Sequence, residues 1–437
     1  MLGRVGKAIV KRKCRPVAIP SDLNSITSID YENEVAAQEA GLGEEAADAI
    51  WDGVQSFYKA GMHPLISICL RRGGKLVFNR SIGYHSGDFD SADAVVADFN
   101  TPVCLFSASK AISAVLLHLL AQQNKIHLLD PVCHYIPAFA AGGKANITIY
   151  QLLAHRAGVP GLGENVDPQL LYDREEALAR ICAAETSDKL GRSPAYHAIT
   201  GGYIIDELIR VTTGLTIQQY LDRYIRKPMG MKYFRYGMTA RDLKKAAVHR
   251  STGLPVTGKF GDAISNVLGL EYEKIVELCN SADFGQAVLP SANLYCTAEE
   301  STRFFQMLLD NGRYKDKQIM APLTVYRAVQ EAGKARLDGS LKLPMRYSPG
   351  FMLGGNPIGM YGRNSHFAYG HVGLANIICW ADPERDIAVS ILNTGKPILG
   401  PQIPSFIRLL FSIAKHCPRV RDMETAGVPV LGQVVNL

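Results

Sequence analysis

The sequence contains no long apolar run. No stretch approaches the roughly eighteen apolar residues of a transmembrane helix, so no membrane span is expected. The start of the chain lacks acidic residues and also lacks the apolar core of a secretory signal. We therefore expect residues 1–34 to form a basic, solvated tail on a cytoplasmic protein. A peripheral membrane anchor or an organellar transit peptide is the alternative for this segment. Its basic residues are Arg4, Lys7, Lys11, Arg12, Lys13 and Arg15.

Metal-binding and disulfide patterns are missing as well. The nine cysteines include no CxxC pair, HExxH is absent, and no Cys/His cluster has ligand spacing. The odd cysteine count and the apolar neighbours of Cys69, Cys104 and Cys379 predict reduced thiols in a core. A net charge of +6 over 437 residues is too small to indicate a nucleic-acid partner. We expect no metal and no organic cofactor, and the oligomeric state is left open.

The hydrophobic pattern predicts strands near both ends of the chain and helices between them. The expected strands span residues 65–70, 75–82, 347–353, 374–380 and 386–392. Helices are expected over 35–60, from about Ser107 onward, and over 402–415, and residues 145–345 are mainly helical in pattern. Capping boxes, in which a hydroxyl and an amide or carboxylate satisfy two backbone donors, are expected to start helices at Thr148, Thr216 and Thr297.

These elements predict an α+β fold with one antiparallel sheet flanked by helices. The sheet lobe is expected over residues 50–106 and 346–416, and a mainly helical lobe over 107–345. Together they form a single domain over 50–416, with a C-terminal tail over 417–437. The cleft between the two lobes is the expected site.

A serine hydroxyl and a lysine amine lie three residues apart in Ser107-Ala108-Ser109-Lys110. Residues at this spacing share one face of a helix, and a lysine that has lost part of its hydration can take a proton from the hydroxyl. The start of the helix also offers the backbone N–H of Ser107 to a developing oxyanion. The alternative is an ordinary surface pair. We favour a buried pair, because the helix that follows is apolar on nearly every face.

Two further segments carry groups that suit acyl transfer. Tyr196 precedes a helix, and a phenol beside a lysine ammonium can be driven toward phenolate and act as a base. In Gly370-His371-Val372-Gly373, Gly373 allows close backbone approach, Leu374 offers a second oxyanion N–H, and His371 can contact substrate or the Tyr/Lys pair. The alternatives are a tyrosine that packs a helix entry and a structural histidine. His155 is expected to hold a loop by hydrogen bonds.

The order of these motifs resembles the serine β-lactamase-like superfamily over about residues 50–400. This group includes class C β-lactamases, penicillin-binding proteins, D-amino-acid peptidases and family VIII carboxylesterases. Its SxxK motif resembles Ser107…Lys110, its LLxHxSG loop resembles residues 152–158, its second motif begins at Tyr196, and its third resembles His371-Val372-Gly373. The GxSxG motif of α/β-hydrolases is absent. The resemblance implies a β-lactamase/transpeptidase-like fold and acylation of Ser107. Lys110 and Tyr196 would carry the proton, and the N–H groups of Ser107 and Leu374 would bind the oxyanion.

The second and third motifs depart from those of β-lactam-binding relatives. Ala198 stands where most relatives carry an Asn that binds the substrate amide, and His371 stands where they carry a Lys that attracts a substrate carboxylate. Both changes favour small ester substrates with short or medium acyl groups, cleaved by a carboxylesterase. One alternative is a β-lactamase, D-amino-acid peptidase or penicillin-binding protein. The other is an inactive scaffold or binding module of the same fold, which the joint presence of Ser107, Lys110 and Tyr196 argues against.

Overall fold

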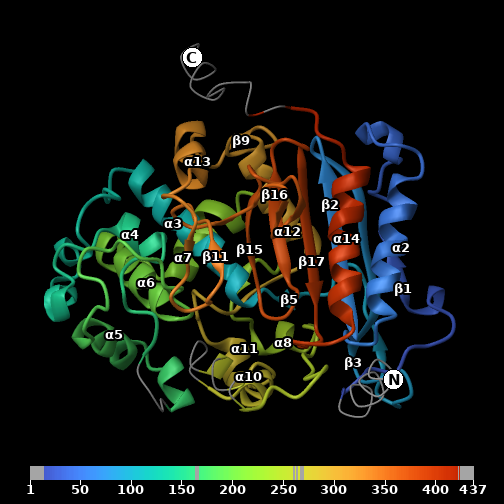
Figure 1. Ribbon diagram of the computed structural model, residues 1–437, viewed down its shortest axis with the longest axis horizontal. Helices are drawn as coiled ribbons and strands as arrows, with labels where there is room; N and C mark the ends of the chain where they lie inside the picture. The colour runs from blue at the N-terminus through green and yellow to red at the C-terminus, as the bar shows by residue number, and fades with distance from the viewer. Residues whose placement is uncertain are drawn as a thin grey trace, which may run out of the picture.

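The computed structural model describes residues 14–162, 167–258, 261, 264–265, 270–421 and 423 (Figure 1). The basic cluster from Arg4 to Lys13 and most of the expected C-terminal tail lie outside these residues. No helix within the described ranges has the length and apolarity needed to cross a bilayer.

Strands from both ends of the chain form one antiparallel sheet. The order β1-β3-β2-β17-β16-β15-β12, with β4 paired to β3, makes an eight-stranded sheet. Its centre joins β2 to β17 from Ile66↔Asn393 to Arg72↔Ile387, so early and late segments lie side by side. The strands are β1 Thr27–Ile29, β2 Leu65–Arg72, β3 Lys75–Ser86, β4 Val95–Val96, β12 Met352–Leu353, β15 Tyr369–Val372, β16 Ile378–Asp382 and β17 Ile387–Asn393.

Helices cover both faces of this sheet, which explains why its central strands β2 and β17 are buried along almost all of their length. Alternate residues of β2 point to opposite faces, so Ile66 and Ile68 enter one core while Leu65 and Cys69 enter the other. The first core is closed by α2 (Ala46–Tyr58) and α14 (Gln402–His416), which lie side by side in Figure 1. The second is closed by α12 (Ala298–Leu309).

The helical lobe is built around α3 (Ser109–Gln122), whose residues from Ser109 to Leu120 are all buried. Its first turn lies beside a small sheet of β5 (Val103–Cys104), β7 (Leu294–Cys296) and β6 (Arg235–Tyr236). The three capping boxes at Thr148, Thr216 and Thr297 are confirmed. The other helices are α4 Ile149–Leu153, α5 Arg174–Ala183, α6 Thr200–Thr213, α7 Ile217–Leu221, α8 Ala240–Leu243, α10 Tyr272–Leu278, α11 Ala282–Gln286 and α13 Pro322–Val329.

Several predicted boundaries were wrong. The helix expected over 35–60 is interrupted at Gly41, whose φ of +70° ends a short 3-10 turn before α2 begins. The strand expected over 374–380 starts only at Ile378, because residues 374–377 form the turn between β15 and β16. Within the strand expected over 347–353, only Met352–Leu353 forms a strand, β12, and Tyr347 makes a single bridge to Met352.

The expected tails also begin or end at other residues. Within the segment 1–34, β1 pairs with β3, so this part of the chain belongs to the sheet and is not a solvated tail. At the other end, Cys417 is fully buried and the Val420 N–H donates to the Glu384 carbonyl, so the chain stays docked beyond residue 417.

Candidate active site

Ser107 lies on a sharp turn between β5 and α3. It occupies a 3-10 turn, Phe106–Ala108, that runs directly into α3. Phe106 has a φ of +48°, which is strained for a bulky side chain and persists only where packing holds it. The Phe106 ring packs against His249 at 4.8 Å between centroids. The turn leaves Ser107 partly accessible while its neighbours Phe106 and Ala108 are buried.

The Lys110 amine faces the Ser107 hydroxyl. Its Nζ lies 3.2 Å from Ser107 Oγ and 2.9 Å from the carbonyl oxygen of Ser291. Lys110 is buried, and this burial lowers its pKa from 10.5 to about 7. A large fraction of the amine is therefore uncharged near neutral pH, where it can accept a proton.

Tyr196 approaches the same pair from a distant part of the chain. The Lys110 Nζ lies 5.0 Å from the centroid of the Tyr196 ring. Burial raises the pKa of Tyr196, and its hydrogen bond with the Ser107 side chain offsets only part of that rise. The expectation that the lysine drives this phenol toward phenolate was wrong, because burial and the nearby Asp338 carboxylate both raise the pKa of Tyr196. Tyr196 is a neutral phenol near neutral pH, so Lys110 is the better base.

Asp338 holds Tyr196 in place. Its carboxylate is fully buried, and Oδ1 accepts a hydrogen bond from the Tyr196 backbone N–H at 3.1 Å. The same oxygen accepts from the backbone N–H groups of Ser340 and Leu341, and Oδ2 accepts from the Tyr347 hydroxyl. His155 adds a second tie, since its carbonyl accepts from Ala195 N–H, as expected for a residue that holds a loop.

His371 lies within β15, where its ring faces Tyr196 at 6.1 Å between centroids. Its Nδ1 is 2.7 Å from the Val372 carbonyl oxygen, which can only accept, so Nδ1 carries the hydrogen. Burial, together with the Lys110 charge, lowers the pKa of His371 to about 3. The ring is therefore neutral, and its buried Nε2 has no partner among the described residues. Nε2 is a free acceptor beside Tyr196.

The loop after β15 approaches the Ser107 turn closely. A Cβ on Gly373 would lie 2.4 Å from the Leu105 carbonyl oxygen, so only glycine fits there. Leu374 follows in the turn, not at the start of a strand as predicted. Its N–H makes no hydrogen bond with the described part of the chain, which leaves it available to an oxyanion.

The structure thus brings Ser107, Lys110, Tyr196 and His371 together, with Gly373 next to the residues before Ser107. The Ser291 carbonyl and the Asp338 carboxylate were missed by sequence reasoning. Both contacts join residues more than 140 positions apart, and no local motif marks either residue.

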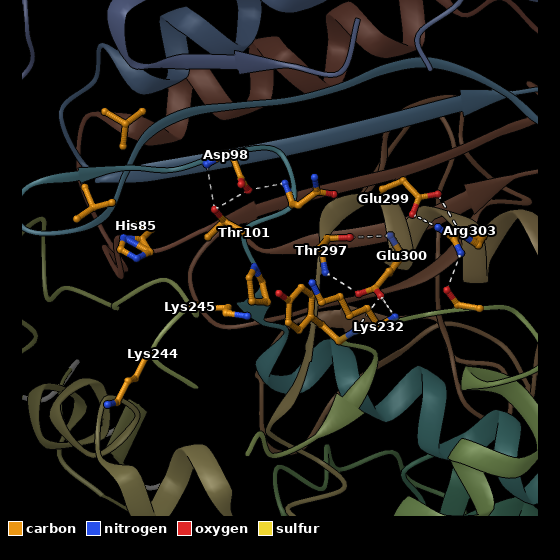
Figure 2. A pocket seen from close by; sticks show the side chains of 16 residues that line it. His85, Asp98, Thr101, Lys232, Lys244, Lys245, Thr297, Glu299, Glu300 and Arg303 are labelled. Carbon is orange, nitrogen blue, oxygen red and sulfur yellow. Dashed lines mark hydrogen bonds and ion pairs between the residues drawn. The ribbon is translucent and has the colours of Figure 1, made fainter. Parts of the chain in front are cut away.

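A separate hollow of about 620 Å³ lies between the strand β4, the segment 98–102 and the start of α12 (Figure 2). None of the four grouped side chains lines it. Its acidic groups are already engaged: Glu299 pairs with Arg303, and Glu300 accepts from the backbone N–H groups of Lys232 and Tyr233. No group of three or more His, Cys, Asp or Glu side chains in the described ranges is arranged to hold a metal ion.

The Beta-lactamase family model matches residues 54–403. The chain belongs to the Beta-lactamase family. This family of serine hydrolases has the β-lactamase/transpeptidase-like fold that the motifs predicted, and the sheet and helical lobe described above are that fold.

Known relatives agree with this assignment. The chain is 28% identical over 352 residues to the esterase/beta-lactamase LipL of Mycobacterium tuberculosis, covering 75% of this chain and 78% of LipL. A penicillin-binding protein homologue from Caulobacter crescentus has a similar structure, with a TM-score of 0.73 and 22% identity over 85% of this chain and 98% of that one. A family VIII carboxylesterase matches with a TM-score of 0.72 and 22% identity, over 84% and 96% of the two chains.

Proposed function

We propose that this serine hydrolase is a carboxylesterase that cleaves small esters through an acyl-enzyme on Ser107. One observation carries the proposal: the Lys110 amine, with a pKa near 7, lies 3.2 Å from the Ser107 hydroxyl. A hydroxyl needs such a base to become a nucleophile.

The reaction proceeds in two halves. Uncharged Lys110 takes the proton of Ser107 as its Oγ attacks the ester carbonyl, and the N–H groups of Ser107 and Leu374 stabilise the oxyanion. As the C–O bond breaks, the proton passes through the neutral Tyr196 phenol to the leaving alcohol, and acyl-Ser107 remains. Water then attacks this ester, gives a proton to the same relay and releases the acid, which restores the Ser107 hydroxyl.

The surroundings of the relay favour esters over carboxylate-bearing β-lactams. His371 is neutral, so it offers no charge to a substrate carboxylate at the third motif. Ala198 is buried beside Tyr196 and has no side-chain donor or acceptor for a substrate amide. An ester requires neither contact.

A β-lactamase or D-amino-acid peptidase is the second candidate, because the name of LipL includes both esterase and beta-lactamase. The two functions predict different substrate preferences. An esterase turns over p-nitrophenyl butyrate with a higher kcat/KM than a chromogenic cephalosporin, and the second candidate reverses that order.

Labelling with a fluorophosphonate probe tests the nucleophile directly. The wild type should be labelled on Ser107, as located by peptide mass spectrometry, and Ser107→Ala should lose both labelling and esterase activity. Ser109→Ala is a poor control because Ser109 Oγ accepts from the Leu294 N–H, so Ser412→Ala on α14 serves instead. Labelling that persists in Ser107→Ala would place the nucleophile elsewhere and end the proposal.

A further inference from the structure

A second buried lysine lies behind the proposed oxyanion site. Lys396 follows β17, and its side chain is fully buried. Its Nζ is 2.8 Å from the Asn393 carbonyl oxygen, 3.2 Å from Asn393 Oδ1 and 3.4 Å from the Leu374 carbonyl oxygen. It also lies 4.9 Å from the centroid of the Phe106 ring. One amine therefore contacts the residue before Ser107 and the residue that carries the other oxyanion donor.

The surroundings of Lys396 do not supply a counter-ion. Within the described ranges no carboxylate lies within ion-pair distance of its amine. The titratable groups that face it are His63, His249, Cys104 and Cys279, all of them buried. A buried amine without a carboxylate partner is costly unless hydrogen bonds satisfy it. Backbone and amide oxygens are its partners instead, and one belongs to Leu374.

We propose that Lys396 is a positioning residue for the oxyanion site, an inference that rests on the proposed function. Its hydrogen bond to the Leu374 carbonyl anchors the peptide plane that follows Leu374, which limits how far the adjoining plane with the Leu374 N–H can rotate. Its contact with the face of the Phe106 ring supports the strained turn that presents the Ser107 N–H. Both donors of the oxyanion site are thereby tied to one amine from the end of β17.

Lys144 provides a matched control within the same chain. It is also buried, its Nζ donates to the carbonyl groups of Ala141, Cys182 and Ala184, and it lies 5.4 Å from the Phe139 ring. It therefore shares the burial, the carbonyl partners and the aromatic neighbour of Lys396. None of its partners belongs to the Ser107 turn or to the loop after β15. The Lys144→Met variant therefore measures the effect of removing a buried lysine that does not contact the oxyanion site.

The experiment compares Lys396→Met, Lys396→Gln and Lys144→Met in the full-length protein. The acyl-enzyme is formed with an ester carrying a ¹³C-labelled carbonyl, and its infrared carbonyl band is recorded. A carbonyl held by two N–H donors absorbs at lower wavenumber than a free one. We expect Lys396→Met to shift the band to higher wavenumber and to lower kcat by about 10-fold or more, with KM within about 2-fold. This decrease is smaller than the roughly 10²–10³-fold loss of kcat that follows removal of an oxyanion donor itself. Lys396→Gln, which keeps an N–H donor, should show a smaller shift.

Each outcome is decisive. An unchanged carbonyl band and kcat in folded Lys396→Met would overturn the proposal, and so would an equal change in Lys144→Met. Failure of both Lys396 variants to fold would make the residue a stability element and would also overturn it. Failure of the proposed function is distinguishable, because the wild type would then form no acyl-enzyme at Ser107.

Discussion

The backbone N–H of Tyr196 donates to the buried carboxylate of Asp338 at 3.1 Å, across 142 positions of the chain. This bond ties the phenol of the proposed relay to the hairpin β10 (Arg336–Leu337) and β11 (Pro344–Met345). The position of Tyr196 relative to Ser107 therefore depends on a residue that does no chemistry itself.

Asp338→Ala tests this dependence. It leaves the buried N–H of Tyr196 and the partly buried N–H groups of Ser340 and Leu341 without their acceptor, at a cost of about 1–3 kcal/mol for the buried group. We expect a lower melting temperature and a kcat reduced by about 10-fold or more. Asp338→Asn keeps Oδ1 as acceptor, and its amide can donate to the Tyr347 hydroxyl, so its kcat should stay within about 3-fold. Esterase kinetics with thermal melts check both variants, and a wild-type kcat in Asp338→Ala would contradict this role.

The pH dependence of the rate follows from Lys110. Its pKa is about 7, and only its uncharged form can accept the Ser107 proton. Below pH 7 kcat/KM should rise about 10-fold per pH unit, and above it should level off. Lys110→Arg is the matched variant, since a guanidinium stays protonated at all of these pH values, and we expect it to be inactive throughout. A wild-type profile that is flat between about pH 5.5 and 8.5 would remove Lys110 as the base.

The sequence predicted the parts of this site that lie close together in the chain, but not the contacts between distant segments. The spacing of Ser107 and Lys110 is one turn of helix, so sequence alone places the amine near the hydroxyl. The protonation of Tyr196 depends on its burial among residues from distant segments, and no pattern near residue 196 shows that burial. The same holds for Asp338 and Lys396, which reach the site only because β17 and the hairpin β10–β11 fold against it.

The fold was likewise predicted where local sequence pattern determines an element and mispredicted where tertiary packing does. The hairpin of β2 and β3, the capping boxes and α14 follow from local pattern and lie where they were expected. The start of β16 was misplaced because residues 374–377, three of them apolar, form a turn with positive φ at Ala375 and Asn376. Packing of this loop against Leu105 overrides the strand preference of its sequence.

Gly373→Ala should impair catalysis through that loop. The added Cβ would lie 2.4 Å from the Leu105 carbonyl oxygen and 2.8 Å from Ile377 Cγ2, so the loop must shift and carry the Leu374 N–H with it. We expect kcat to fall by about 10-fold or more, in line with a weakened oxyanion donor. Gly43→Ala is the control, because its Cβ would meet nothing within 4 Å. Steady-state kinetics of both variants decide the matter, and equal kcat values would refute it.

Acid should destabilise the protein through buried neutral histidines such as His118. Its Nε2 lies 2.7 Å from the Pro349 carbonyl oxygen, and burial lowers its pKa to about 4 from 6.5. Between these values the unfolded chain binds a proton that the native state does not. The free energy of unfolding therefore falls as pH drops from about 6.5 to 4, by up to about 1.4 kcal/mol per pH unit for this group. Above pH 6.5 the group contributes no dependence.

His118→Gln isolates that contribution. It removes the titrating group and keeps an N–H donor for Pro349, so its unfolding free energy should depend less steeply on pH between about 6.5 and 5 than that of the wild type. His134→Gln, at an exposed position, is the control for a change of histidine content. Urea denaturation at several pH values measures the slopes. If His118→Gln and the wild type lose stability in parallel as the pH falls, His118 is protonated in the native state and its burial does not exclude the charge.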